Sequence, residues 1–254
     1  MKTLENKVAI ISGATSGIGR GLAELFASEG AAVVIAGRDE LAGNSVAQTI
    51  SESGGTARYI WTDVSSPEAV ESLVEQAVDE FNRINVVVPN AGILGLGSVT
   101  DMSLDTWYQT IDVNLNGVFY LMRYSIPVMQ RGEGGSIIVT GSIGSQKGFP
   151  NHAAYCATKG ALLSLVKQAA VDYAPEIRIN LIQPGPVDTK LYEDSRFAFP
   201  NPKTVLQEVP DNLPMKKIGT PGDIAQMALF LASDNANWIT GGVFQVDGGA
   251  TAAG

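Results

Sequence analysis

Tyr155 and Lys159 are the residues whose types and spacing best suit chemistry. Four residues apart on a helix, they share one face, so the phenol and the ammonium can converge on one point. A free phenol has a pKa of about 10, and an ammonium about 5 Å away, at an effective dielectric constant near 20, favours the phenolate by roughly 3 kcal/mol. We therefore expect the pKa of Tyr155 to fall to about 8 or slightly below, which suits proton exchange at neutral pH.

Ser142 is the third candidate, because it precedes Tyr155 by thirteen residues and follows the apolar run Ile137-Ile138-Val139. This run predicts a buried strand with Ser142 near its carboxyl end, where the hydroxyl would hydrogen-bond a substrate oxygen beside the phenol. A Tyr and a Lys at helical spacing also occur by chance on solvated faces. The rest of the chain must therefore supply the specificity.

The composition indicates one large α/β domain. The chain has 254 residues, of which 45% are hydrophobic and 17% are charged, and its net charge is −9. This acidic balance disfavours a nucleic-acid partner and provides no basic helix for a membrane surface. A single cysteine (Cys156) and a single histidine (His152) exclude a disulfide framework and the usual zinc sites, so we expect no metal. With no signal peptide or apolar run of about 18 residues, we expect a cytoplasmic protein.

Short β-branched apolar runs alternate with amphipathic segments along the chain. The alternation predicts a single domain, residues 1–254, with a doubly wound, Rossmann-like parallel sheet of about seven strands and helices on both faces. In such sheets, ligands bind at the carboxyl ends of the strands. The expected strands are Lys7–Ser12, Ala32–Ala36, Ala57–Trp61, Ile84–Val88, Ser136–Thr140, Ile177–Ile182 and Val243–Val246, and the expected helices are Gly17–Glu29, Glu40–Ser53, Pro67–Arg83, Leu104–Gln130, Ala153–Ala174 and Pro221–Ala232.

The first strand-to-helix turn indicates a phosphate ligand. It contains Gly13, Gly17 and Gly19 in a G-x3-G-x-G pattern, which differs from the general G-x-G-x-x-G dinucleotide pattern. Glycines let the backbone approach a pyrophosphate closely, and the following helix offers free N–H groups at its positive end. A tight packing turn is the alternative, but the strand before it and the helix after it favour phosphate binding.

The chain resembles the classical short-chain dehydrogenase/reductase family over essentially its whole length. Pro89 stands where the family usually has an asparagine, which weakens the match there slightly and affects no catalytic position. The segments that carry the resemblance follow the family's order: Gly13-x3-Gly17-x-Gly19, Asp63-Val64, Asn90-Ala91-Gly92, Asn114, Ser142, Tyr155-x3-Lys159 and Pro184-Gly185.

The resemblance implies an NAD(P)-dependent oxidoreductase that interconverts a secondary alcohol and a ketone by hydride transfer. Tyr155 would be the general acid/base and Ser142 would bind the substrate oxygen. Lys159 would anchor the nicotinamide ribose and lower the phenol pKa, and Asn114 would hold a water that connects Lys159 to solvent. The implied cofactor-binding residues are Gly13, Thr15, Ser16, Gly17, Ile18, Gly19, Arg38, Asp63, Val64, Asn90, Ala91, Gly92, Tyr155, Lys159, Pro184, Gly185, Val187 and Thr189.

Cofactor preference depends on the residues after the second expected strand. Gly37 occupies the position that is usually acidic in NAD-preferring relatives, and Arg38 follows it. A guanidinium matches a 2′-phosphate, whereas a carboxylate there would select NAD. The pattern favours NADP over NAD. Asp39 complicates this assignment, because its carboxylate can reach the ribose. An acidic residue directly before a helix more often acts as the N-cap of that helix.

The substrate pocket is expected to be apolar and to hold an alcohol or ketone of moderate size. Residues 188–219 are too long for a simple connection and would form a lid. Leu191, Tyr192, Phe197 and Phe199 in this lid fit either pocket lining or ordinary packing. Gln146 and His152 are polar candidates near Tyr155, for which a surface loop position is the simpler interpretation. Other expected lining residues are Ile93-Leu94-Gly95-Leu96, Ile143-Gly144, Phe149-Pro150 and Pro186-Val187.

Two other functions remain open. A 3-oxoacyl-[acyl-carrier-protein] reductase would need a basic patch for its acidic partner, and only Arg123, Arg131 and Lys167 could form a small one. A non-catalytic dinucleotide sensor or scaffold is disfavoured because all four catalytic side chains are present. By resemblance, we expect a homotetramer that pairs through Leu104–Gln130 and Ala153–Ala174 and acts on a small molecule.

Overall fold

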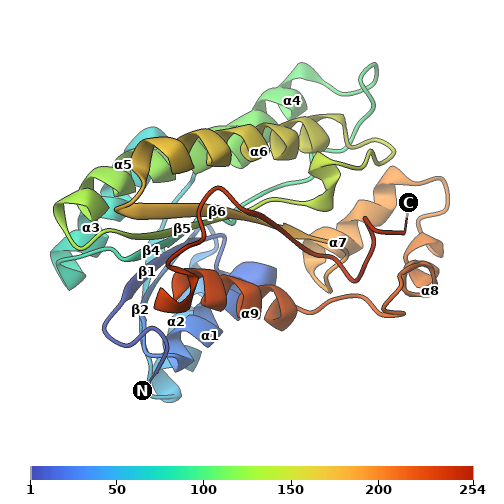
Figure 1. Ribbon diagram of the computed structural model, residues 1–254. Helices are drawn as coiled ribbons and strands as arrows, with labels where there is room; N and C mark the ends of the chain where they lie inside the picture. Colours follow the sequence, from blue (N-terminus) through green and yellow to red (C-terminus); the bar gives the residue numbers. More distant parts are fainter. Residues whose placement is uncertain (1, 254) are drawn as a thin grey trace.

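A computed structural model describes residues 2–253, in which seven parallel strands form one sheet in the order β3-β2-β1-β4-β5-β6-β7 (Figure 1). The chain reverses direction across the sheet between β1 and β4, which pair directly. This confirms the predicted doubly wound fold. The strands are β1 (Val8–Ser12), β2 (Ala32–Gly37), β3 (Thr56–Trp61), β4 (Val86–Val88), β5 (Gly135–Thr140), β6 (Ile177–Pro184) and β7 (Val243–Val246).

Helices cover both faces of the sheet, and each face has its own buried apolar core (Figure 1). One core joins the sheet to α3 (Pro67–Phe81), α5 (Gly117–Arg131) and α6 (Ala153–Tyr173). The other joins it to α1 (Gly17–Ser28), α2 (Glu40–Glu52) and α9 (Pro221–Ala232). The central strands β1, β4 and β5 are therefore buried on both sides, which explains their continuous apolar runs.

The expected helix Leu104–Gln130 is three elements, because a π-helical turn interrupts it. α4 (Leu104–Ile111) leads into η1 (Asp112–Asn116), which α5 follows. The turn contains Asn114, whose side chain bonds outside the helix, and Gly117 packs against Val64 so closely that a Cβ there would lie 3.0 Å from it. Such π-turns are frequent at functional sites.

The segment expected to be an irregular lid contains short helical elements. These are α7 (Lys190–Asp194), η3 (Ser195–Ala198), η4 (Val205–Gln207) and α8 (Val209–Asn212), all at the carboxyl edge of the sheet (Figure 1). Thr189 caps α7 by accepting a hydrogen bond from Tyr192 N at 3.2 Å. Within residues 2–253, no helix is long and apolar enough to cross a membrane, and no group of three His, Cys, Asp or Glu side chains could hold a metal ion.

Candidate active site

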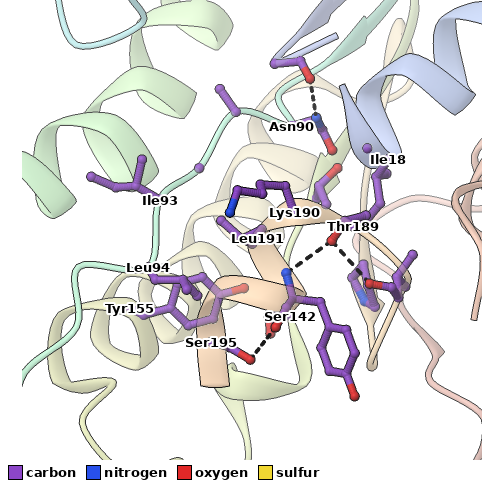
Figure 2. A pocket seen from close by; sticks show the side chains of 18 of the residues that line it. Ile18, Asn90, Ile93, Leu94, Ser142, Tyr155, Thr189, Lys190, Leu191 and Ser195 are labelled. Atoms are coloured by element: carbon purple, nitrogen blue, oxygen red, sulfur yellow. Dashed lines mark hydrogen bonds between the residues drawn. The ribbon is translucent and has the colours of Figure 1, made fainter. Parts of the chain in front are cut away.

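A continuous cleft of about 720 Å³ opens at the carboxyl edge of the sheet and runs from the first glycine turn to Tyr155 (Figure 2). It lies over the point where the strand order reverses, which is where doubly wound sheets bind ligands. Residues of α7, including Lys190 and Leu191, lie across it from Ser142 and Tyr155 (Figure 2). The cleft is thus bounded by strand ends on one side and by the lid on the other.

The glycine turn after β1 is shaped to receive a phosphate group. Gly13 and Gly17 have φ of +64° and +52°, and a Cβ at Gly19 would lie 2.2 Å from the Gly13 carbonyl oxygen. Ser16 precedes α1 without a side-chain cap, so the first N–H groups of this 12-residue helix are free of side-chain acceptors. Free N–H groups and the positive end of the helix dipole favour a pyrophosphate, so this part of the cleft fits the diphosphate of a dinucleotide.

Asn90 and Ser12 fix the glycine turn to the end of β4. The Asn90 side-chain nitrogen donates to the Ser12 carbonyl at 3.0 Å and to the Gly13 carbonyl at 3.3 Å. The Ser12 hydroxyl accepts from the backbone nitrogens of Asn90 at 3.0 Å and Ala91 at 3.1 Å. The floor of the cleft is therefore held by polar contacts between two neighbouring strand ends.

Ser142 and Tyr155 meet at the other end of the cleft. Ser142 accepts a hydrogen bond from Gly144 N at 3.0 Å, which orients its hydroxyl. Burial raises the pKa of Tyr155, and a hydrogen bond with Ser142 opposes that effect only in part. The expectation of a lowered phenol pKa is therefore wrong for the protein alone. That expectation rests on the attraction between the phenolate and the ammonium, whereas desolvation of the buried phenol has the larger effect on its pKa.

Lys159 is itself buried, with 4% of its surface exposed. Its ammonium nitrogen lies 5.7 Å from the centre of the Tyr155 ring and donates to the Thr140 carbonyl oxygen at 2.8 Å. Burial lowers the pKa of Lys159 from 10.5 to about 8. The two side chains do face one another, as the helical spacing predicts, but burial shifts the pKa of each toward its neutral form, which the spacing does not predict.

Asn114 lies behind this pair and does not line the cleft. Its side-chain oxygen accepts from Ile93 N at 2.8 Å, and its nitrogen donates to Ile93 O at 2.9 Å and to the Thr158 hydroxyl at 3.3 Å. A Cβ at Gly92 would lie 3.4 Å from the Asn114 side-chain oxygen and 3.7 Å from the Lys159 nitrogen. Asn114 thus joins the π-turn, the loop after β4 and the helix that carries Lys159.

Arg38, Asp39 and Asp63 lie at the far end of the cleft. Arg38 is 56% exposed and its guanidinium is 3.8 Å from the Asp63 carboxylate. Burial alone would raise the pKa of Asp63, but hydrogen bonds from Ser65 and the charge of Arg38 lower it overall. Asp39 accepts from Ala42 N at 3.0 Å as the N-cap of α2, which confirms its expected capping role.

The lid contributes apolar side chains to the substrate end of the cleft. Leu191, Tyr192 and Phe199 line the cleft, whereas Phe197 is 62% exposed and lies outside it. The surface interpretation holds for Gln146, which is exposed, but is wrong for His152, which is buried and lines the cleft. His152 is buried because its backbone forms a bridge with Gly97, which draws the loop before α6 inward.

Comparisons with known proteins agree with this geometry. A family model described as enoyl-(acyl carrier protein) reductase matches residues 13–251. Cyclohexanol dehydrogenase of Acinetobacter sp. (strain SE19) is 38% identical over 248 residues, which cover 97% of this chain and 95% of the relative. A crystal structure of a short-chain type dehydrogenase/reductase from Mycobacterium marinum is 34% identical, with a TM-score of 0.90, and the match covers 98% of this chain and 96% of that chain.

The crystal structure of levodione reductase is still more similar in shape, with a TM-score of 0.95 at 30% identity, covering 99% of this chain and 100% of that one. The chain belongs to the short-chain dehydrogenase/reductase family. Its members use a nicotinamide dinucleotide, and the predictions of an oxidoreductase and of alcohol–ketone interconversion are confirmed. The family is the one that the sequence motifs resemble.

Most of the residues that the family pattern assigns to the cofactor share this cleft, while their individual roles stay predictions. Gly19 does not line it, because this glycine packs against Gly13, and Asn114 lies behind it. The sequence did not indicate Ser12, which fixes the floor of the cleft, or Thr140, whose carbonyl accepts the hydrogen bond from Lys159. Both stand at the carboxyl end of an expected strand, and that position is the signal that could have found them. The predicted cofactor residues that line the cleft are Gly13, Thr15, Ser16, Gly17, Ile18, Arg38, Asp63, Val64, Asn90, Ala91, Gly92, Tyr155, Lys159, Pro184, Gly185, Val187 and Thr189.

Proposed function

We propose that this short-chain dehydrogenase/reductase is an NADP-preferring reductase of cyclic or similarly compact ketones, with the secondary alcohol as the product. The observation that carries the proposal is the convergence of Ser142, Tyr155 and Lys159 at one end of a cleft whose other end is an uncapped helix N-terminus. A nicotinamide cofactor, when bound, supplies or accepts the hydride. The residues of the chain then have to bind, orient and move a proton.

Tyr155 is the proton donor in this proposal. A buried phenol with a raised pKa is protonated at neutral pH, which is the form that reduction requires. Ser142 hydrogen-bonds the same substrate oxygen and so fixes it beside the phenol. Lys159 would hold the ribose hydroxyls of the cofactor, which would give its buried ammonium acceptors beyond the Thr140 carbonyl. Asn114 supports the π-turn and a water that links Lys159 to solvent.

The lining of the substrate end supports a compact apolar substrate. Leu94, Ile143, Phe149, Leu191 and Phe199 surround it, and their side chains offer no charge to a ligand. Apolar pockets with a few convergent polar groups are typical of small-molecule sites. The name of the cyclohexanol dehydrogenase relative points to the same substrate class for that protein.

The test is a spectrophotometric screen at ~340 nm with NADPH and NADH against cyclohexanone, acyclic ketones, sugars and a 3-oxoacyl carrier-protein substrate. We expect cyclohexanone to be reduced faster than the acyl-carrier substrate. A preference for the carrier substrate would favour the acyl-carrier reductase instead. Tight NADPH binding with no turnover on any carbonyl would support a sensor.

The contacts at the end of β2 support the proposed preference for NADP. A Cβ at Gly37 would lie 2.8 Å from the Thr15 methyl group, so an acidic side chain at this position would require Thr15 to move. Asp39 is engaged as a helix cap, and Arg38 is half exposed beside the cleft. The guanidinium, which lies 3.8 Å from the Asp63 carboxylate, is therefore the positively charged group that a 2′-phosphate would meet.

Arg38→Asp should raise the KM for NADPH by roughly 10- to 100-fold relative to that for NADH, since one charge-assisted hydrogen-bond pair contributes about 1.5–3 kcal/mol. Initial rates with both cofactors measure the ratio. Arg58→Asp is the matched control, because Arg58 is 58% exposed, pairs with Glu80 and does not line the cleft. Equal effects of Arg38→Asp on the two cofactors would contradict the proposed preference.

We also propose that the protein is a cytoplasmic homotetramer, as the family resemblance suggests. Exposed apolar side chains on the helices concerned support this assembly: Leu104 is 69%, Phe119 45% and Val171 81% exposed. Light scattering should then give four times the 26.7 kDa chain mass. A monomeric mass would contradict it.

A further inference from the structure

The only histidine of the chain lies in the substrate half of the cleft, next to the proposed proton donor. His152 is 5% exposed, and the centre of its ring is 5.9 Å from that of Tyr155, with the two rings at 76°. On its other side the ring packs edge-on against Phe149, also at 5.9 Å. The catalytic scheme above makes no use of this imidazole.

A hydrogen bond determines which ring nitrogen of His152 carries the proton. Nδ1 lies 2.6 Å from the carbonyl oxygen of Pro150. A carbonyl oxygen only accepts, so Nδ1 must be the N–H donor, and in the neutral ring Nε2 is left as an acceptor. The backbone is fixed as well, because Gly97 N donates to Asn151 O at 2.8 Å and His152 forms a bridge with Gly97. The ring therefore has one orientation and one neutral tautomer.

Nε2 is the ring nitrogen that the hydrogen bond to Pro150 leaves available. It has no hydrogen-bond partner within residues 2–253. In that part of the chain, the fully buried side-chain polar atoms without a partner are the hydroxyl oxygens of Ser125 and Tyr192, so Nε2 is not sealed from solvent. Because His152 is buried overall and lines the cleft, the open side of Nε2 is the cleft.

We infer that His152 is a specificity-determining residue that accepts, through Nε2, a hydrogen bond from a hydroxyl group of the substrate close to the reacting carbonyl. This rests on the proposed function. A buried acceptor beside the apolar side chains of Phe149 and Leu94 penalises substrates that leave it unpaired and favours those that bring a donor. The substrate class is thereby narrowed to hydroxyketones, and in the oxidative direction to diols.

A second ketone oxygen is disfavoured at the same place. The neutral Nε2 and a carbonyl oxygen are both acceptors, so a diketone gains no hydrogen bond from His152. The short distance between the rings of His152 and Tyr155 means that the hydroxyl and the reacting carbonyl belong to one small molecule. 2-Hydroxycyclohexanone, compared with cyclohexanone, is the matched pair of probes.

Two substitutions distinguish the hydrogen-bonding roles of the two ring nitrogens of His152. In His152→Asn, the side-chain N–H can replace the Nδ1 donor to Pro150, while the Nε2 acceptor is removed. In His152→Gln, the longer amide places an oxygen near the Nε2 position. We expect His152→Asn to lower the ratio of kcat/KM for 2-hydroxycyclohexanone over cyclohexanone by about 3- to 10-fold, the usual worth of one hydrogen bond, and His152→Gln to keep at least half of the wild-type ratio.

The ratio is the readout, because a merely structural role would reduce both rates together. An unchanged ratio in His152→Asn, or a wild-type enzyme with no preference for the hydroxyketone, would overturn the assignment.

If neither ketone is reduced at all, the proposed function fails instead, and NMR still tests the role of His152. The single histidine gives one set of ¹⁵N imidazole signals, and protein saturated with NADP⁺ should show the Nδ1–H tautomer and a shift of Nε2 on addition of 2-hydroxycyclohexanone. An Nε2–H tautomer or an unmoved signal would refute the assignment.

Discussion

Tyr155→Phe is expected to lower kcat for ketone reduction by about 10²- to 10⁴-fold, the contribution of a positioned general acid. The phenyl ring keeps the edge-on contact with His152, so the shape of the cleft is preserved. What is lost is the hydroxyl that donates the proton and its hydrogen bond with Ser142. Stopped-flow single-turnover rates with NADPH measure the chemical step directly.

Cofactor binding distinguishes loss of chemistry from loss of structure in this variant. NADPH fluorescence titration should give a Kd for Tyr155→Phe within about threefold of wild type, because phosphate contacts and the glycine turn supply most of the affinity. Tyr108→Phe is the matched control, since Tyr108 is 58% exposed on α4 and does not line the cleft, and it should leave kcat unchanged. A kcat for Tyr155→Phe within tenfold of wild type would remove the phenol from the mechanism.

The strand and helix pattern could be predicted from the sequence because the central strands are buried on both faces. Runs such as Val8–Ser12 have no alternation to misread, and glycine or proline marks their limits. Most expected boundaries therefore agree with the structure to within two residues. The π-turn around Asn114 could not be predicted in this way, because it depends on hydrogen bonds between the Asn114 side chain and the backbone of Ile93, which is distant in the sequence.

The candidate site was predictable in its residues but not in its electrostatics. Spacing places Tyr155 and Lys159 on one face, and the structure agrees, but spacing carries no information on burial. Burial raises the pKa of the phenol and lowers that of the ammonium, and His152, from the loop bridged at Gly97, is one of the residues packed against the phenol. His152 was misplaced for the same reason, because a residue in a short loop is buried only by tertiary contacts.

Lys159→Met is expected to lower kcat/KM by about 10²- to 10³-fold, the usual effect of removing one preorganised donor. The same substitution is expected to stabilise the cofactor-free protein against unfolding. The buried ammonium has the Thr140 carbonyl as its hydrogen-bond acceptor, which is little compensation for lost hydration. A fall of the pKa from 10.5 to about 8 corresponds to roughly 3 kcal/mol of destabilisation. We expect the free energy of unfolding of cofactor-free Lys159→Met to exceed that of wild type by ~1–3 kcal/mol at pH 7, measured by urea denaturation.

The pH dependence identifies the cause of that stabilisation. Because the pKa of Lys159 is lower in the folded state, the unfolded chain binds more protons between pH 8 and 10.5, so the penalty is fully present below about pH 8 and is lost as the pH rises toward 10.5. The stability difference between the variant and wild type should therefore shrink to about a quarter of its pH 7 value by pH 10. Lys167→Met, on the exposed side of the same helix, should change stability by less than about 0.5 kcal/mol. A stability difference for Lys159→Met that stays constant with pH would show that packing, not the buried charge, is responsible. The cost of burying the ammonium would then no longer explain why the cleft favours a ligand that brings hydroxyl acceptors.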